Sequence, residues 1–166
     1  MSQIIEEVRS KAVVYTGDEI GQEKCKFVLT EVGLPNGLLP LRDIIECGHV
    51  EETGFVWLKQ KKKIEHRFEK VGSLVSYASE VTAYVEKNRI RKLTGVKARE
   101  LLLWVTLTEI YVDDPPTGKI TFKSSLGLSK QQPTAAFQIE DVKEDAKGVK
   151  EMKEVKEMKE VKEVKA

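Results

Sequence analysis

From Ile44 onward, the apolar residues of this 166-residue chain change to a spacing of two, and this alternation limits the folds that the chain can adopt. Val81, Ala83 and Val85, for example, alternate with polar or amphipathic residues, as a half-buried β-strand requires. Turn-forming sequences such as Glu51-Glu52-Thr53-Gly54 interrupt the pattern at short intervals. We therefore expect antiparallel strands at residues 44–50, 55–60, 64–71, 74–77, 81–86, 90–93, 100–112 and 119–123, with 136–139 closing the sheet.

The segment before these strands has the spacing of a helix instead. Asp18 is suited to cap a helix that begins there, and Gly33-Leu34-Pro35 is suited to end it. One mostly apolar stripe of this helix is formed by Ile20, Lys24, Phe27, Val28 and Val32. The predicted fold is mainly β: an antiparallel β roll or barrel, with an N-terminal α-helix from residues 1–33 packed on it.

Residues 140–166 form a repetitive Lys/Glu/Val tail whose pattern does not suit packing. Val149, Met152 and Val155 begin a series of apolar residues spaced by three, and this spacing drifts around a helix without making one face. Glu151 and Glu154 are like charges three residues apart, which also disfavours a helix. We expect a single domain at 1–139, helical at 1–33 and β at 44–139, followed by a disordered or weakly helical charged tail.

The sequence favours a soluble cytoplasmic protein. Its N-terminus lacks a basic region followed by an apolar one, and its longest apolar run, residues 101–105, is far shorter than the roughly 18 residues of a membrane span. Cys25 and Cys47 are the only cysteines, so a disulfide framework and a four-cysteine zinc site are both excluded. We expect two reduced thiols.

A formal net charge of +1 conceals a strongly basic middle of the chain. Residues 59–99 hold 12 basic and 4 acidic side chains, a net charge of +8, whereas residues 1–58 carry 5 basic and 10 acidic ones. On one sheet face or one barrel end, such residues would attract phosphate or anionic headgroups. The candidate anion-binding residues are Lys59, Lys61, Lys62, Lys63, Arg67, Arg89, Arg91 and Lys92.

Two other roles remain open for this basic segment. The lysines could form a solvated outer sheet face that protects a strand edge from pairing with other chains. Nucleic acid is a weaker candidate partner, because no zinc finger, helix-turn-helix signature or aromatic RNA-binding motif accompanies the charges.

A second candidate site is apolar. Residues 34–41 form a turn punctuated by proline and glycine, with more leucines than a surface loop needs. Together with two tryptophans they could line the mouth of a cavity, although packing in the core is the alternative. An apolar mouth beside a cationic rim would suit an anionic lipid or another amphiphile, with peripheral contact to a membrane. The candidate cavity residues are Leu34, Leu38, Leu39, Leu41, Trp57 and Trp104.

Signatures of catalysis are scarce, which favours a non-enzymatic protein. The sequence has no nucleophile elbow, no phosphate-binding loop and no His-Glu-x-x-His zinc motif. The spacing of two histidines and two cysteines matches no paired-ligand pattern, so we expect no metal and no cofactor. A nucleophilic pair of Cys47 and His66 is left open by the sequence but is not favoured.

Several strings resemble a known family. They are Gly17-Asp18-Glu19-Ile20, residues 33–40 (GLPNGLLP), residues 52–60 (ETGFVWLKQ), residues 93–98 (LTGVKA) and Leu102-Leu103-Trp104-Val105. In this order and spacing, over roughly residues 10–139, the chain resembles the plant DUF538 family. Within that family it is most similar to the group related to the trichome-size protein "smaller with variable branches".

The resemblance implies a mainly β, roll-like or barrel-like fold with an N-terminal helix. It also implies an uncharacterised function, because members have been likened to lipid-binding bactericidal/permeability-increasing proteins, and chlorophyll binding, ester hydrolysis and a stress response have been proposed. No catalytic motif is available to transfer to this chain. Our leading hypothesis is a non-enzymatic binder of an anionic amphiphile or membrane lipid. The alternatives are a chlorophyll-binding or ester-hydrolysing protein, and a growth or stress regulator that acts through protein interactions.

Overall fold

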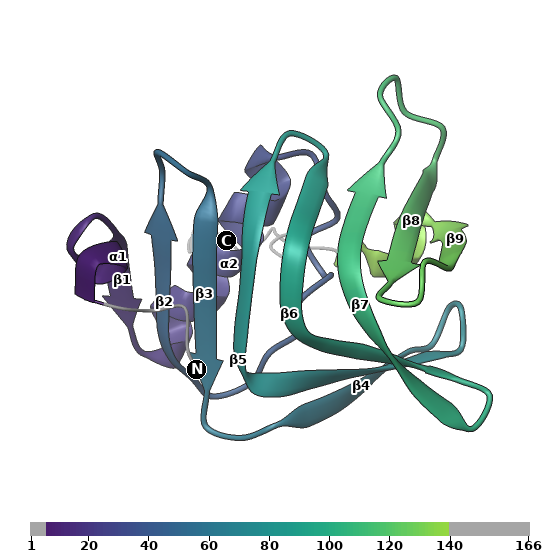
Figure 1. Ribbon diagram of the computed structural model, residues 1–166, viewed down its shortest axis with the longest axis horizontal. Helices are drawn as coiled ribbons and strands as arrows, with labels where there is room; N and C mark the ends of the chain where they lie inside the picture. The colour runs from purple at the N-terminus through teal and green to yellow at the C-terminus, as the bar shows by residue number, and fades with distance from the viewer. Residues whose placement is uncertain (1–5, 140–166) are drawn as a thin grey trace, which may run out of the picture.

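A computed structural model describes residues 6–139 of the chain, and Figure 1 shows its elements. Residues 1–5 and the predicted tail at 140–166 lie outside the described residues. The helical elements are α1 (Glu6–Ser10), α2 (Asp18–Glu31) and the short 3-10 helix η1 (Thr134–Phe137). The strands are β1 (Val13–Thr16), β2 (Ile44–Val50), β3 (Phe55–Gln60), β4 (Ile64–Phe68), β5 (Ser73–Glu86), β6 (Arg89–Glu100), β7 (Leu103–Val112), β8 (Lys119–Ser124) and β9 (Ser129–Pro133).

The strands form one antiparallel sheet in the order β1-β2-β3-β5-β6-β7-β8-β9, with β4 paired to β5 beside this path. Within residues 6–139, the edge strands β1 and β9 do not pair with each other, so the sheet is open and no barrel closes. The predicted mainly β, antiparallel fold with a helix against the sheet is confirmed. Residues 136–139, expected to close the sheet, instead contribute to η1 and the residues after it.

The long strands bend, because β5 changes its partner halfway along. Its first residues, 73–77, pair with β4, whereas residues 80–84 pair with β3. β6 accommodates the bend with irregular backbone at Lys92 (φ 53°) and Gly95 (φ 84°). A Cβ atom on Gly95 would lie 2.5 Å from the Glu80 carbonyl oxygen, so the two strands approach closely only because Gly95 lacks a side chain. The lower part of the sheet in Figure 1 therefore turns away from the rest. We call it the arm; it consists of β4, residues 73–77 of β5, residues 96–100 of β6 and residues 103–106 of β7.

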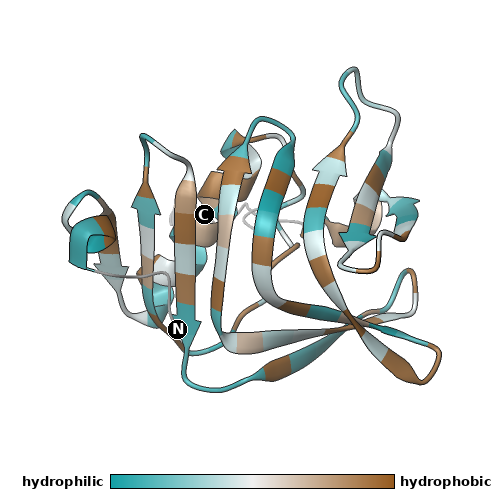
Figure 2. Cartoon of the chain, viewed as in Figure 1, coloured by the Kyte–Doolittle hydropathy of each residue, from teal (hydrophilic) through white to brown (hydrophobic). Residues whose placement is uncertain are grey.

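Helix α2 covers one face of the sheet, which we call the inner face. It buries Gly21, Cys25 and Leu29, and a Cβ atom on Gly21 would lie 2.6 Å from the Ile44 side chain. The period of two then decides which residues meet the helix, because successive strand residues point to opposite faces. Figure 2 shows this alternation as bands of apolar and polar residues along the strands.

The outer face carries a second, smaller core around β3. Val50, Phe55 and the fully buried Trp57 lie there, covered by Val8, Ala12, Val14 and Tyr84. The indole ring of Trp57 rests against Gly48, its partner in β2, at a distance that leaves no room for a Cβ atom. Because both faces of β3 are covered, Phe55, Val56, Trp57 and Leu58 are all buried.

A partly buried carboxylate, that of Glu46, lies at the edge of this outer core. The Trp57 Nε1–H donates a hydrogen bond to Glu46 Oε2 at 2.8 Å, and Arg9 Nη1 pairs with the same oxygen at 2.7 Å. The hydrogen bond from Arg9 holds the pKa of Glu46 below its ordinary value. Glu46 thus satisfies the indole N–H while the α1 segment is tied to the sheet.

Several predicted boundaries are wrong. The segment 1–33 is not continuously helical, because β1 pairs with β2 between the two helices. Asp18 is the first residue of α2 rather than its cap; Gly17 occupies the cap position, and Asp18 Oδ1 accepts a hydrogen bond from the Ile44 N–H at 2.9 Å. This bond ties the start of the helix to β2.

Other predicted strands differ in how they are joined. The predicted strands 74–77 and 81–86 form the single bent strand β5, because Ala78-Ser79 continues the strand instead of turning. The predicted strand 100–112 is divided instead: β6 ends at Glu100, and Leu101-Leu102 forms a two-residue turn before β7. Residues 129–133, which we did not predict as a strand, form β9.

We predict that Gly48→Ala destabilises the protein, because the added methyl group collides with the Trp57 ring. Overpacking of this kind costs about 1–3 kcal/mol of unfolding free energy. Chemical denaturation followed by tryptophan fluorescence measures the loss. A double-mutant cycle with Trp57→Leu should recover most of the Gly48→Ala penalty, and equal penalties in both backgrounds would contradict this packing.

We also predict an acid-sensitive contribution to stability from Glu46. Because the folded-state pKa of Glu46 is lowered, its contribution is complete above the ordinary glutamate pKa of about 4.3 and is lost as the pH falls through the folded-state pKa. Glu46→Gln and Arg9→Gln should each flatten the fall of unfolding free energy on acidification. Equal slopes in wild type and Glu46→Gln would refute this assignment.

Candidate functional site

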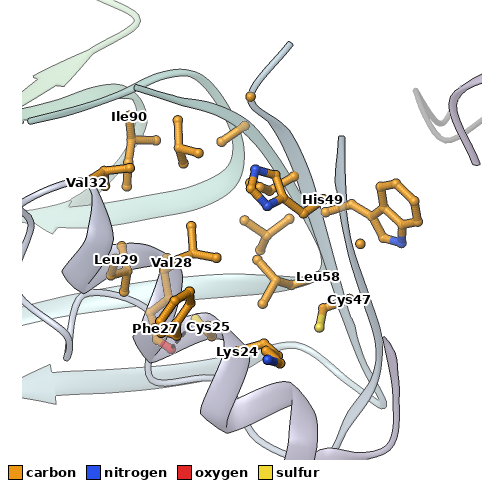
Figure 3. Close-up of a pocket in the computed structure, with 18 of the residues that line it drawn as sticks. Lys24, Cys25, Phe27, Val28, Leu29, Val32, Cys47, His49, Leu58 and Ile90 are labelled. Carbon is orange, nitrogen blue, oxygen red and sulfur yellow. Dashed lines mark hydrogen bonds between the residues drawn. The ribbon is translucent and has the colours of Figure 1, made fainter. Parts of the chain in front are cut away.

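A cavity of about 420 Å³ lies between α2 and the inner face of the sheet. Figure 3 shows side chains of the helix facing side chains of the strands across it. Its volume lies in the range of small-molecule sites, and most of its wall is apolar. The helix contributes Cys25, Val28, Leu29 and Val32, and the strands contribute Cys47, Val56, Leu58, Val81, Ala83, Val85, Ile90 and Leu93.

The mouth of the cavity combines exposed apolar groups with a few charges. Phe27 is 57% exposed and Val13 is 56% exposed, although both are apolar. Lys24 Nζ lies 5.2 Å from the centre of the Tyr15 ring and 5.7 Å from that of Phe27, so two aromatic faces hold the ammonium at the mouth. The remaining polar side chains of the lining are Glu31, His49 and Glu51.

This arrangement can hold a molecule with an apolar body and one polar end. The apolar wall provides no fixed hydrogen-bond donors deep inside, so the body of a ligand would be recognised by burial of its surface. The Lys24 ammonium, the His49 imidazole and the Tyr15 hydroxyl belong to the lining and are able to donate hydrogen bonds to an anion.

The structure separates the six apolar residues proposed for a cavity. Leu39 lines the cavity, whereas Leu34, Leu38 and Leu41 are buried in the core, where the Tyr77 hydroxyl donates a hydrogen bond to the Leu38 carbonyl oxygen at 2.9 Å. The loop 34–41 therefore serves mainly as packing beneath the sheet.

The two tryptophans are placed differently from each other. Trp57 borders the cavity, yet its ring is fixed in the outer core by Gly48 and Glu46. Trp104 is not part of the lining; it lies half-buried on β7, with the Arg99 guanidinium 5.4 Å from its ring centre.

None of the eight basic residues proposed for anion binding lines the cavity. Lys59, Arg89 and Arg91 are direct neighbours of the lining residues Leu58 and Ile90 and therefore point to the outer face. Lys61, Lys62 and Lys63 are exposed in the connection from β3 to β4, and Arg67 is exposed on β4.

The remaining three lie together near the start of β6. Arg89 forms an ion pair with Glu109, and Arg91 pairs with Glu86 at 2.7 Å. Arg91 and Lys92 also lie over the ring of Tyr84, at 5.3 and 5.5 Å from its centre. Two of the three positive charges in this group are therefore balanced locally by carboxylates.

Lys24 and Phe27 are site residues that the sequence analysis missed, although a signal was present. Both belong to the apolar stripe of the predicted helix, and a lysine within such a stripe is unusual because the charge must reach solvent or a partner. The partner rings explain its position, since Tyr15 comes from the unpredicted strand β1.

The surroundings of the two cavity thiols, Cys25 and Cys47, disfavour the thiolate form that nucleophilic attack requires. Burial raises the pKa of the Cys25 thiol to about 12 and also raises that of Cys47, so both remain protonated at neutral pH. His66 does not line the cavity; it packs against Phe68 on β4, with ring centres 4.6 Å apart, and burial lowers its pKa. The pairing of Cys47 with His66 has no support in this geometry.

Residues 6–139 contain neither a metal-type cluster nor a membrane-spanning helix. No cluster of three or more His, Cys, Asp or Glu side chains is arranged to hold a metal ion in this part of the chain. None of the helices described there is long and apolar enough to span a membrane.

Comparison with known proteins gives one match. A family model described as "Protein of unknown function, DUF538" matches residues 25–138, from the middle of α2 to the residue after η1. This range includes most of the cavity lining and excludes β1 and the first turns of α2. The chain matches no curated protein and no solved structure.

We predict that neither cysteine reacts readily with a thiol reagent in the folded protein. Burial and the raised pKa values of Cys25 and Cys47 should make alkylation at pH 8 much slower than in denaturant. Mass spectrometry after timed iodoacetamide treatment measures each site. Rapid modification of Cys47 in the native protein would show a reactive thiol and revive the hydrolytic alternative.

Proposed function

The chain belongs to the DUF538 family, and we propose that this member is a non-enzymatic binding protein that holds an anionic amphiphile in the cavity under α2. The observation that carries the proposal is the cavity itself, with an apolar interior and a lysine fixed at its mouth. The family description provides no function, and the chemistry of the lining supports the proposal.

The interior favours a ligand with an apolar body. Leu29, Leu58, Val81 and Ile90 are almost fully buried by their own neighbours, and the cavity between them has no buried charged group. Each Å² of apolar ligand surface that enters would contribute about 25 cal/mol of transfer free energy. A long polar or highly charged molecule would lose its hydration in this space without recovering hydrogen bonds.

The mouth favours an anionic head on that ligand. Lys24 is the one lysine or arginine in the lining, and its two aromatic neighbours restrict where its ammonium can lie. Glu31 and Glu51 at the same mouth would repel an anion placed near them, so the head is expected beside Lys24 rather than across the opening.

For the eight candidate anion-binding residues, contact with anionic headgroups stays a separate prediction. Lys61, Lys62 and Lys63 are exposed and close in sequence, and anionic headgroups of a membrane would be their natural partners. This role does not depend on cavity binding, because none of the eight contributes to the lining.

Binding is favoured over the hydrolytic alternative because the raised thiol pKa values of Cys25 and Cys47 oppose nucleophilic attack at neutral pH. Chlorophyll binding remains compatible with an apolar cavity, but no described residue favours it over a simpler amphiphile. The protein-interaction alternative stays a prediction, and the charged tail, one segment that could recruit partners, lies outside the described residues.

The test uses two fluorescent probes that share a ring system: anilinonaphthalene sulfonate, which is anionic, and N-phenyl-naphthylamine, which is neutral. We predict that Lys24→Glu weakens binding of the sulfonate roughly three- to tenfold and leaves the neutral probe nearly unchanged. Val28→Trp, which fills the cavity from α2, should weaken binding of both probes.

Lys26→Glu is the matched control, because it makes the same charge change on α2 but does not line the cavity. It should leave both affinities near the wild-type values. Unchanged affinities in Val28→Trp, or equal effects of Lys24→Glu and Lys26→Glu on the sulfonate, would refute the proposed site.

A further inference from the structure

The tip of the β6–β7 hairpin exposes three consecutive leucines. Leu101 is 95% exposed, Leu102 84% and Leu103 69%, the highest values among the exposed large hydrophobic residues apart from Leu126 at 71%. The tip projects from the end of the arm at the lower right of Figure 1, and Figure 2 shows it as an apolar band there. These side chains do not contribute to the core or to the cavity lining.

The backbone conformation at the tip is also one that leucine rarely adopts. Glu100 pairs with Leu103, so Leu101 and Leu102 form a two-residue hairpin loop. Leu101 has φ +58°, a conformation in which glycine, asparagine and aspartate are preferred at such turns. Leucines at these positions therefore lower local stability and leave apolar surface in water, and neither cost is offset by contacts within the described chain.

Groups typical of a membrane interface surround the tip. Arg99 Nε–H donates a hydrogen bond to the Leu101 carbonyl oxygen at 3.2 Å, and its guanidinium lies over the Trp104 ring. Lys97 is exposed two residues earlier on β6 and points to the same side as Arg99.

A second apolar loop lies beside the base of the hairpin. Lys130 on β9 pairs with Glu100 at 3.5 Å, and the Ser125 N–H donates to the Thr106 carbonyl oxygen at 2.9 Å. These contacts bring the β8–β9 loop, with exposed Leu126 and Leu128, next to the arm.

We propose that the leucine tip of the β6–β7 hairpin inserts into the surface of a lipid bilayer that carries anionic headgroups. A convex apolar tip on a narrow hairpin needs surroundings that can close around it, and the acyl region of a bilayer does so without a preformed pocket. Trp104 and Arg99 then lie at headgroup depth, where aromatic and basic side chains are favoured.

Charge complementarity selects a bilayer surface over a protein groove. Lys97, Arg99 and Lys130 outnumber Glu100 around the tip, so the net local charge is positive. One shallow insertion gives reversible binding, which the anionic surface strengthens in a salt-dependent way. The tip and the cavity share no residue, so this inference does not rest on the proposed amphiphile.

The test is flotation of the full-length protein with phosphatidylcholine vesicles, made with and without phosphatidylserine. The test variant is Leu101→Gly/Leu102→Asn/Leu103→Thr, which gives the loop residues suited to its backbone and therefore should not lower the unfolding temperature. We expect wild type to float with the anionic vesicles, and the variant to bind them at least about tenfold more weakly.

Three comparisons make the result specific. Ile45→Thr removes a side chain that is 50% exposed on β2 and should float like wild type. Lys97→Gln should reduce the preference for phosphatidylserine while leaving the tip intact. On insertion, the emission of Trp104 should shift to shorter wavelength, whereas Trp57, fully buried, adds a constant background.

Absence of wild-type flotation with anionic vesicles, or equal flotation of wild type and the tip variant, would overturn the proposal. The proposal would also be overturned if the wild type were a dimer that does not bind vesicles and the tip variant were a monomer. The tip would then be an interface between two copies of the chain. Binding of anilinonaphthalene sulfonate without vesicles, measured on the same tip variant, reports separately on the cavity.

Discussion

The structure depends on one mismatch in size: a single helix must cover the inner face of a much wider sheet. Helix α2 has 14 residues and is therefore about 21 Å long, and it packs mainly against β1 and β2. The leucines of the loop 34–41 fill the space farther along, where Leu38 meets Tyr77. Between the helix and strands β3, β5 and β6, the side chains do not fill the whole space, and the space that remains is the cavity. The candidate site is thus a direct consequence of the fold.

Much of the sheet could be predicted from the sequence, because alternation and turn residues are local signals. The bounds of β2 and β3 agree with the prediction, as does the turn between them. The sequence could not reveal that β5 is one bent strand, because the bend depends on the approach of Gly95 to Glu80 from another strand. β1 was missed for the same reason: four residues between two helices become a strand only through pairing with β2.

The candidate site was predicted only in outline. An apolar cavity was expected, but most of the leucines assigned to it pack in the core, and the residues that form its mouth come from α2 and β1. The basic residues lie in strands and turns, as predicted. The alternation that predicted the strands also places the basic side chains of these strands on the face opposite the cavity lining. Tertiary packing decides which face of an alternating strand is buried. For this reason the cavity lining and the basic side chains of the strands lie on opposite faces of the sheet.

The central claim is that the space beneath α2 accepts an apolar ligand, and methyl NMR tests it most directly. With the isoleucine, leucine and valine methyl groups labelled, a soluble anionic amphiphile such as a medium-chain fatty acid is titrated into the protein. We expect saturable shifts at Val28, Leu29, Val56, Leu58 and Ile90, with Leu101, Leu102 and Leu103 unaffected below the micelle concentration. Shifts confined to the hairpin tip or to the outer core, or no saturable shifts at all, would contradict it.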